Sequence, residues 1–180
     1  MTPVERAAFD AVGMAGRFRH GGVEQMLSWR LRMPRATDLL NEKSRLGAGD
    51  VATIDPLATV IDAARLMNER RIGALVVLDH ENRLVGMFTE RDVMVRVVAE
   101  ERNPRETRVG DVMTKQVIAC RPDTPSDDLR ALMREKRIRH VPIVEDGAVI
   151  GMVSIGDLNI ADVKVMTETI SYLEQYMYSA

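Results

Sequence analysis

Apolar and polar positions along the chain follow a pattern that occurs twice. In each copy a short extended stretch, at 51–55 and again at 117–121, precedes a proline, and apolar residues at helical spacing follow it. Two runs rich in β-branched and apolar residues come next, separated by a polar turn, and a second helix closes the copy. The pattern therefore predicts two β-α-β-β-α units and an α+β fold. The first helix of each unit is marked by apolar residues at helical spacing, Ala63, Leu66 and Met67 in the first unit and Leu129, Leu132 and Met133 in the second. In the second unit we expect Thr124 to be the N-cap of this helix and Pro125 to be its first residue.

The two units are copies of each other. Pro56 and Pro122 stand 66 positions apart, and the Leu-Met pairs of the two helices keep the same offset. Beyond the polar turn the offset falls to 65, which brings Asp92 into register with Asp157. A turn is where a change of one residue is tolerated. A unit of about 60 residues buries too little surface to be stable alone, so the two copies are expected to pack on each other with pseudo-twofold symmetry.

The duplication also divides the chain. We expect a first repeat over 36–100, a linker over 101–110 and a second repeat over 111–162, preceded by a helical extension over 1–35 and followed by a continuing helix over 163–180. The last segment has an apolar face at helical spacing. This face could cover the core of the same chain or contact a second copy, and the spacing alone does not decide between them. The residues of the face are Val163, Met166, Ile170, Leu173 and Met177.

Composition excludes several classes of function. A net charge of −2 provides no basic surface for nucleic acid, and no apolar run approaches the roughly 18 residues that a membrane span needs. The single cysteine, Cys120, rules out an internal disulfide and a cysteine cage for a metal, and the three histidines stand far apart. We find no nucleophile elbow, no phosphate-binding lysine loop and no set of residues that suggests a reacting centre. The chain is therefore expected to be cytoplasmic, without a metal and without catalytic activity.

Both copies carry one polar motif after their last strand. It is Thr89-Glu90-Arg91-Asp92 in the first and Ser154-Ile155-Gly156-Asp157 in the second. A hydroxyl followed three residues later by an acid forms a capping box, which stabilises a helix start and needs no ligand. The same geometry suits a nucleotide, because free N–H groups at a helix start attract phosphate and a carboxylate can accept hydrogen bonds from a ribose diol. Its presence at equivalent places in both copies favours a binding function.

The two candidate sites differ in their positive charges. Arg91 is unfavourable at a helix start, which makes sense if its guanidinium serves a phosphate, although a solvated surface arginine is the alternative. Gly156 replaces it in the second copy. Conversely, Arg139 and His140 enter the strand of the second copy where the first has Gly73 and Ala74. His140 could be a hydrogen-bonded histidine of the core, or it could contact a phosphate or a base edge. The two pockets are therefore expected to be unequal.

Taken together, these motifs resemble a tandem pair of cystathionine-β-synthase (CBS) domains, of the stand-alone bacterial kind. The first repeat carries the resemblance in its Thr89–Asp92 motif, and the second in Asp111-Val112-Met113-Thr114, Arg139-His140-Val141-Pro142 and Ser154-Ile155-Gly156-Asp157-Leu158. The resemblance implies a flat pair that dimerises into a disc and binds adenosine-containing ligands (AMP, ADP, ATP, NAD(H), sometimes S-adenosylmethionine) between the repeats. It also implies that Asp92 and Asp157 hold ribose hydroxyls, that Thr89, Arg91 and Ser154 reach phosphate, and that Thr53-Ile54 and Val117-Ile118 flank the base.

Two functions follow as hypotheses. The first is a ligand-sensing module in which an adenine nucleotide bridges the repeats of a homodimer and signals to an unidentified protein target. The second is a structural or adaptor dimer whose Thr/Ser-x-x-Asp motifs are helix caps and nothing more.

Overall fold

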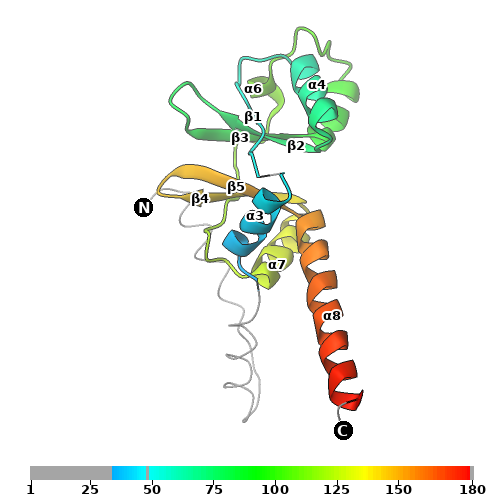
Figure 1. The fold of residues 1–180 in the computed structure, drawn as a ribbon. Coiled ribbons are helices and arrows are strands. Elements are labelled where there is room, and N and C mark those ends of the chain that lie inside the picture. Colours follow the sequence, from blue (N-terminus) through cyan, green and yellow to red (C-terminus); the bar gives the residue numbers. More distant parts are fainter. Residues whose placement is uncertain (1–33, 48, 179–180) are drawn as a thin grey trace.

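The computed structural model describes residues 34–47 and 49–178, so that the expected extension over 1–35 falls almost wholly outside the described residues (Figure 1). Helices and strands alternate as the duplicated pattern predicts. The first repeat and the helix before it comprise α3 (Ala36–Arg45), β1 (Thr53–Ile54), α4 (Val60–Arg70), β2 (Ala74–Leu78), β3 (Leu84–Thr89), α5 (Glu90–Asp92) and the π-helix η1 (Val93–Val98). The remainder comprises α6 (Val109–Val112), α7 (Ser126–Lys136), β4 (His140–Glu145), β5 (Ala148–Ser154) and α8 (Ile155–Tyr178).

Two small sheets face each other and helices cover their outer sides (Figure 1). The first sheet has the order β1-β2-β3, with β1 parallel and β3 antiparallel to β2. The second sheet pairs β4 with β5, and the place of a third strand is taken by a single parallel bridge from Cys120 to Ile143. The predicted α+β fold of two β-α-β-β-α repeats is confirmed. The extended stretch expected at 117–121, before α7, contributes one bridge instead of a strand.

The first helices of the two repeats begin differently. Thr59 is the N-cap of α4, and its side chain accepts a hydrogen bond from the backbone N–H of Asp62. The prediction for α7 was wrong, because Pro125 is the N-cap and the helix begins at Ser126. The hydroxyl of Thr124 accepts instead from the backbone N–H of Arg121, which closes the turn before the helix.

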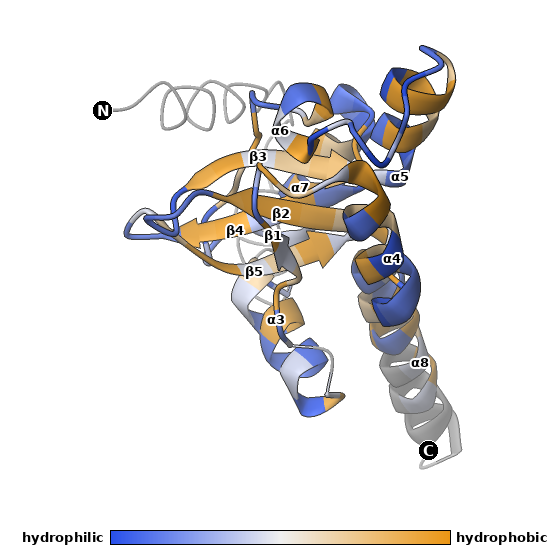
Figure 2. Cartoon of the chain, turned by 90° about the horizontal axis from the view of Figure 1, so that it is seen from above, coloured by the Kyte–Doolittle hydropathy of each residue, from blue (hydrophilic) through white to orange (hydrophobic). Residues whose placement is uncertain are grey.

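Both faces of β2 are buried, and this makes the strand the centre of the first repeat. Leu75 and Val77 face the helices, whereas Ala74 and Val76 face the second sheet together with Met87 of β3. Partly buried side chains of the second repeat pack against this inner cluster, among them Val117, Val149 and Met152. The expected packing of one repeat on the other therefore takes place through the inner faces of the sheets. Figure 2 shows the corresponding concentration of hydrophobic colour on β2, β3, β4 and β5.

The helix that precedes each repeat packs on the other repeat. Val109 and Val112 of α6 belong to the first core, and Ala36 and Leu39 of α3 belong to the second. Backbone hydrogen bonds fix both crossings, from Val109 N to the carbonyl of Ala58 (2.9 Å) and from Ala36 N to the carbonyl of Thr124 (2.9 Å). We expected the first repeat to begin at residue 36. The helix that begins there, α3, instead packs on the second repeat.

Each crossing segment lies against a glycine of the opposite sheet. A Cβ atom on Gly86 would overlap the side chain of Met113, and one on Gly151 would overlap the side chain of Leu40. Gly86 and Gly151 are equivalent positions of the duplication, so the absence of a side chain serves the same close approach twice.

α8 runs on well beyond the body of the molecule (Figure 1). Ala161 is packed in the second core, whereas Val163, Met166 and Ile170 are 63%, 64% and 57% exposed. Among the described residues these three side chains are therefore not part of a core, and the side chains of Leu173 and Met177 lie outside the described ones. Among the described residues, no helix has both the length and the apolar character that a membrane crossing requires.

We expect Gly151→Ala to lower the free energy of unfolding by about 1–3 kcal/mol, because the added methyl group forces Leu40 and α3 to move. Gly156→Ala is the matched control: the nearest atom to its added Cβ is 3.5 Å away, and alanine favours a helix by roughly 0.5–1 kcal/mol over glycine. Urea denaturation followed by circular dichroism measures both variants. Equal stability of Gly151→Ala and the wild type would contradict the close packing of α3 on β5.

Candidate functional site

The first acid, Asp92, is buried at the point where β3 passes into α5. One carboxylate oxygen accepts hydrogen bonds from the backbone N–H (2.9 Å) and the hydroxyl (2.7 Å) of Thr89. The other faces the guanidinium of Arg96 at 3.1 Å and the hydroxyl of Thr114 at 3.4 Å. Arg96 lies one helical turn further along, whereas Thr114 belongs to the segment that follows α6. The carboxylate therefore has four polar contacts, two at each of its oxygen atoms.

The second acid, Asp157, occupies the equivalent place between β5 and α8. Its Oδ2 atom accepts from the backbone N–H (2.7 Å) and the hydroxyl (2.8 Å) of Ser154, and its own N–H donates to that hydroxyl at 3.3 Å. The Thr89–Asp92 pair forms the same reciprocal arrangement. The expected capping boxes are thus present in both repeats. Capping fixes the direction of each carboxylate and in both cases uses only its Oδ2 atom.

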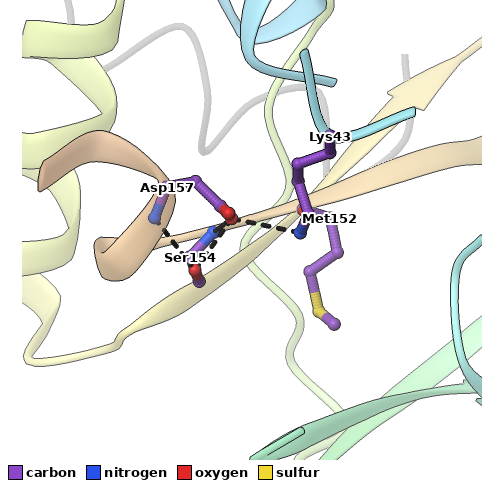
Figure 3. Close-up of polar contacts among 4 residues, drawn as sticks. All are labelled: Lys43, Met152, Ser154 and Asp157. Atoms are coloured by element: carbon purple, nitrogen blue, oxygen red, sulfur yellow. Dashed lines mark hydrogen bonds and ion pairs between the residues drawn. The ribbon is translucent and has the colours of Figure 1, made fainter. Parts of the chain in front are cut away.

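A lysine from the crossing helix α3 contacts the second acid (Figure 3). The ammonium group of Lys43 lies 3.1 Å from Asp157 Oδ2 and 3.0 Å from the backbone carbonyl oxygen of Met152. The exposed fractions of the two charged side chains are 26% for Lys43 and 14% for Asp157. This pair is therefore better shielded from water than an ordinary surface ion pair.

A hollow lies beside this ion pair, between α3 and the start of α8. Polar and apolar side chains line it together: Leu39, Glu42, Lys43, Leu46, Asp157 and Ile160. Asp157 is thus neither sealed in the core nor turned into open solvent.

The arginines expected to serve phosphate do not contact either acid. Arg91 reaches across to the second repeat, where its guanidinium donates to the carbonyl oxygen of Arg137 at 3.1 Å. That carbonyl stands at the end of α7, two residues before the exposed Arg139. Arg91 and the segment that carries Arg139 therefore come together at the boundary between the repeats.

His140, the first residue of β4, lies near charged groups of both repeats. It pairs with Ser154 across β4 and β5, and it is half-buried. Burial lowers the pKa of His140, and the nearby charge of Lys43 lowers it further, against the opposite effect of Asp157 and Glu90. The imidazole is therefore mainly neutral at pH 7, and it feels both the second acid and the start of α5.

The residues expected to flank a base lie on the inner strands. Thr53 and Ile54 form β1 and pair with Val76 and Val77. Val117 packs between the sheets, and Ile118 is half-buried. No hydrogen bond or ion pair within the described residues joins these side chains to either acid, so their role at a base stays a prediction.

Cys120 shows no sign of being a nucleophile. Its backbone forms the bridge to β4, and burial raises the pKa of its thiol to about 11. The thiol is therefore protonated at neutral pH. The described residues also contain no group of three or more His, Cys, Asp or Glu that could hold a metal ion.

Sequence reasoning missed three residues that contact the acids, namely Lys43, Arg96 and Thr114. Two of them stand on crossing segments, which a second internal similarity could have identified. Arg35-Ala36-Thr37-Asp38-Leu39-Leu40 aligns with Arg108-Val109-Gly110-Asp111-Val112-Met113 at an offset of 73. This offset differs from that of the repeats themselves, because the crossing segments precede loops of different length.

The comparison with known protein families agrees with this architecture. The family model described as "CBS domain" matches residues 45–99 and 109–164. The chain belongs to the CBS-domain family. It contains two CBS domains, and such domains generally serve as regulatory modules that bind adenosine ligands.

Individual proteins are similar to this chain in sequence or in structure. The CBS domain-containing protein CBSX3, mitochondrial, of Arabidopsis thaliana is 34% identical over 145 residues, which cover 78% of this chain and 70% of the relative. The crystal structure of the CBS domain NE2398 superposes with a TM-score of 0.68 at 36% identity and covers 73% of this chain and 98% of its own. The hexameric CBS-CP12 protein from bloom-forming cyanobacteria gives a TM-score of 0.56 at 32% identity, covering 61% of this chain and 64% of its own.

His140 provides a test of the charge arrangement in this CBS pair. We expect its pKa to lie below the ordinary value of 6.5 and to rise when Lys43→Met removes the neighbouring charge. Because the folded-state pKa is the lower one, the contribution of His140 to stability is complete above the unfolded value and is lost as the pH falls through the folded one. An NMR titration of the imidazole C–H signals measures this. A pKa above 6.5 would show that His140 is not in this environment.

Proposed function

We propose that this CBS pair is a non-catalytic sensor that binds an adenine nucleotide in the clefts between its repeats. AMP, ADP, ATP and NAD(H) are the candidate ligands. The observation that carries the proposal is that two acids at equivalent positions are both shielded and rigidly oriented. Each stands where a strand of the inner sheets passes into a helix, and each is contacted by a side chain of the segment that crosses from the other repeat.

The chemistry of the two ends of a nucleotide supports this proposal. A ribose diol can donate two hydrogen bonds to a carboxylate whose orientation is already fixed, so that little side-chain entropy is lost on binding. The phosphate would meet the start of the helical segment 90–98 and the guanidinium of Arg91, which now bonds to a backbone carbonyl of the second repeat. In this proposal Arg139 and His140 complete the phosphate side, with Thr53, Ile54, Val117 and Ile118 beside the base.

A regulatory role requires that the ligand prefers one arrangement of the repeats. Arg91 links the first repeat to the end of α7, so a phosphate that draws its guanidinium away would break a contact between the repeats. The ligand would then shift the balance between two arrangements by its different affinity for them. We place this sensor in the cytoplasm, where a single reduced cysteine is the ordinary condition.

An adaptor function is the second candidate. It is favoured by the capping boxes, which account for both acids without any ligand, and by the exposed apolar side chains of α8. The adaptor would bind an unidentified target protein and show no response to nucleotides.

We further propose that the chain forms a homodimer through its last helical segments. Val95 and Val98 of η1 are 55% and 67% exposed, and their equivalents in α8, Ile160 and Val163, are 60% and 63% exposed. The duplication thus places matching apolar side chains on two helices, which suits a self-complementary interface. The hexameric neighbour shows that a protein of this fold can associate with copies of itself.

A thermal-shift panel of AMP, ADP, ATP, NAD, NADH and S-adenosylmethionine tests the sensor function. At least one member is expected to raise the melting temperature, and Asp92→Asn is expected to weaken its binding by roughly ten- to a hundredfold, because a charged hydrogen bond is lost. Asp62→Asn is the matched control, since Asp62 forms a Thr-x-x-Asp cap with Thr59 on the exposed side of α4. A melting temperature that no nucleotide moves would favour the adaptor.

Light scattering after size-exclusion chromatography tests the dimer. We expect Val163→Asp to produce monomers, because a charge would have to be buried in an apolar interface. Leu57→Asp serves as the control, since Leu57 is equally exposed (66%) but lies before α4 and belongs to neither η1 nor α8. If both variants keep the mass of the wild type, the dimer does not use this face.

A further inference from the structure

α8 continues past the point where its counterpart in the first repeat ends. At the offset of 65, the helical segment 90–98 of the first repeat corresponds to residues 155–163 of α8. In the first repeat the chain then turns back at Glu101, whose φ of 52° is left-handed. α8 instead runs on as a helix to Tyr178 (Figure 1). Residues 164–178 form the α8 extension, which the first repeat lacks.

The extension continues an apolar stripe that both repeats share. Up to Val163 the stripe has a counterpart in η1, as the proposed dimer face requires. Its next two members, Met166 and Ile170, are also exposed. The residues 65 positions before them are the exposed Glu101 and Arg105. The two halves of the proposed dimer face therefore match up to Val163 and differ beyond it, where the second repeat stays apolar and the first becomes charged.

Contacts at the base of the extension turn this stripe away from the body of the chain. Ala161 packs in the second core, on the side of α8 roughly opposite to the stripe. On one flank Asp162 pairs with Arg130 of α7 at 2.6 Å. On the other flank Lys164 pairs with Glu42 of α3 at 2.9 Å. The helix is therefore held on three sides, and its apolar stripe faces outward.

The spacing of the stripe is that of a helix that pairs with another helix. From Val163 onward the apolar positions follow at intervals of 3, 4, 3 and 4 residues, while Thr167, Thr169 and Glu174 stand on its flanks. Such a line is narrower than the face with which a helix packs on a globular core. It spans about two heptads, fewer than the three or four that an independent coiled coil needs. The stripe therefore suits a contact that adds to another interface.

The proposed dimer face permits two arrangements with twofold symmetry. In one, α8 packs on η1 of the second copy. In the other, α8 packs on α8 and η1 on η1. Both bury the matching side chains of the two repeats, because these are equivalent by the duplication. The extension distinguishes them: beyond η1 it would find the charged side chains of Glu101 and Arg105, whereas beside α8 it finds an identical apolar stripe.

We propose that two copies associate with α8 against α8, and that their extensions pair along the stripe. This inference rests on the proposed homodimer and adds its orientation, with second repeat against second repeat. Ile160, which belongs to the same stripe, also lines the hollow beside Asp157. The second copy therefore borders that hollow, so that the surroundings of Asp157 depend on the assembly.

A dilution series of the full chain, followed by analytical ultracentrifugation, tests the role of the stripe. Ile170→Asp is expected to raise the dissociation constant of the dimer at least tenfold, because a carboxylate would have to be buried in the seam. Val165→Asp is the matched control. Val165 is 46% exposed in the same helix but lies roughly opposite to the stripe, so its substitution should leave the dissociation constant unchanged. Circular dichroism verifies the helix content of each variant.

Pyrene labels at the middle of the extension report the orientation. Ser171→Cys, in a Cys120→Ala background, places the label at an exposed position next to Ile170. Paired helices lie about 8–10 Å apart, and labels at the centre of the extension meet whether the two helices run parallel or antiparallel. We expect excimer emission from the dimer. The same label at Leu57→Cys is the control and should give monomer emission, since Leu57 belongs to neither η1 nor α8.

The outcomes separate the orientation from the dimer on which it rests. If the wild type is a dimer but Ser171 labels give no excimer, or Ile170→Asp keeps the wild-type dissociation constant, the pairing of the extensions is wrong and the homodimer stands. Equal dissociation of Ile170→Asp and Val165→Asp also overturns the pairing, because the stripe would then have no special part in it. A wild type that is monomeric at every concentration removes the homodimer and this proposal together.

Discussion

The contact between the inner faces of the two sheets is the constraint on which the rest of the structure depends. Ala74, Val76 and Met87 of the first sheet are buried because Val149 and Met152 of the second lie against them. Side chains alternate between the faces of a strand, so the same strands that build each outer core also present this inner surface. Both candidate motifs begin where the inner strands end, at Thr89 and Ser154. Stacking of the sheets therefore fixes the relation between the two sites.

The exchange of crossing segments turns this stack into an asymmetric molecule. α6 and α3 occupy equivalent places on opposite repeats. The segment that carries each helix lies against a glycine of the sheet, at a place where a Cβ atom on that glycine would overlap it. The residues that follow the packed positions reach the acids of those repeats, and they have diverged. Thr114 brings a hydroxyl to Asp92, and Lys43 brings a charge to Asp157. A duplicated backbone can thus present its two acids to different partners.

Local patterns in the sequence sufficed to predict the repeats, their strands and the capping boxes, because hydrophobic spacing and the Thr/Ser-x-x-Asp motif act within a few residues. The failures concern interactions between distant segments. We predicted that α7 begins at Pro125, but it begins at Ser126, and the Thr124 hydroxyl accepts a hydrogen bond from the backbone N–H of Arg121 instead of capping the helix. Cys120 forms one bridge in place of a strand, and α3 lies on the repeat that follows later in the chain. Lys43 could not be assigned to Asp157 from spacing, since only the crossing of α3 brings the two together.

Capping and the proposed ligand binding are compatible uses of one geometry. Thr59 and Asp62 form the same local motif at the start of α4, yet the Asp62 side chain is 55% exposed, against 9% for Asp92 and 14% for Asp157. The cap by itself therefore does not create a recognition site. What distinguishes Asp92 and Asp157 is the crossing segment beside each of them, which contributes Thr114 to the first acid and Lys43 to the second. A carboxylate held in this way has already lost its rotational freedom, and a ligand that replaces one of its partners need not order it again.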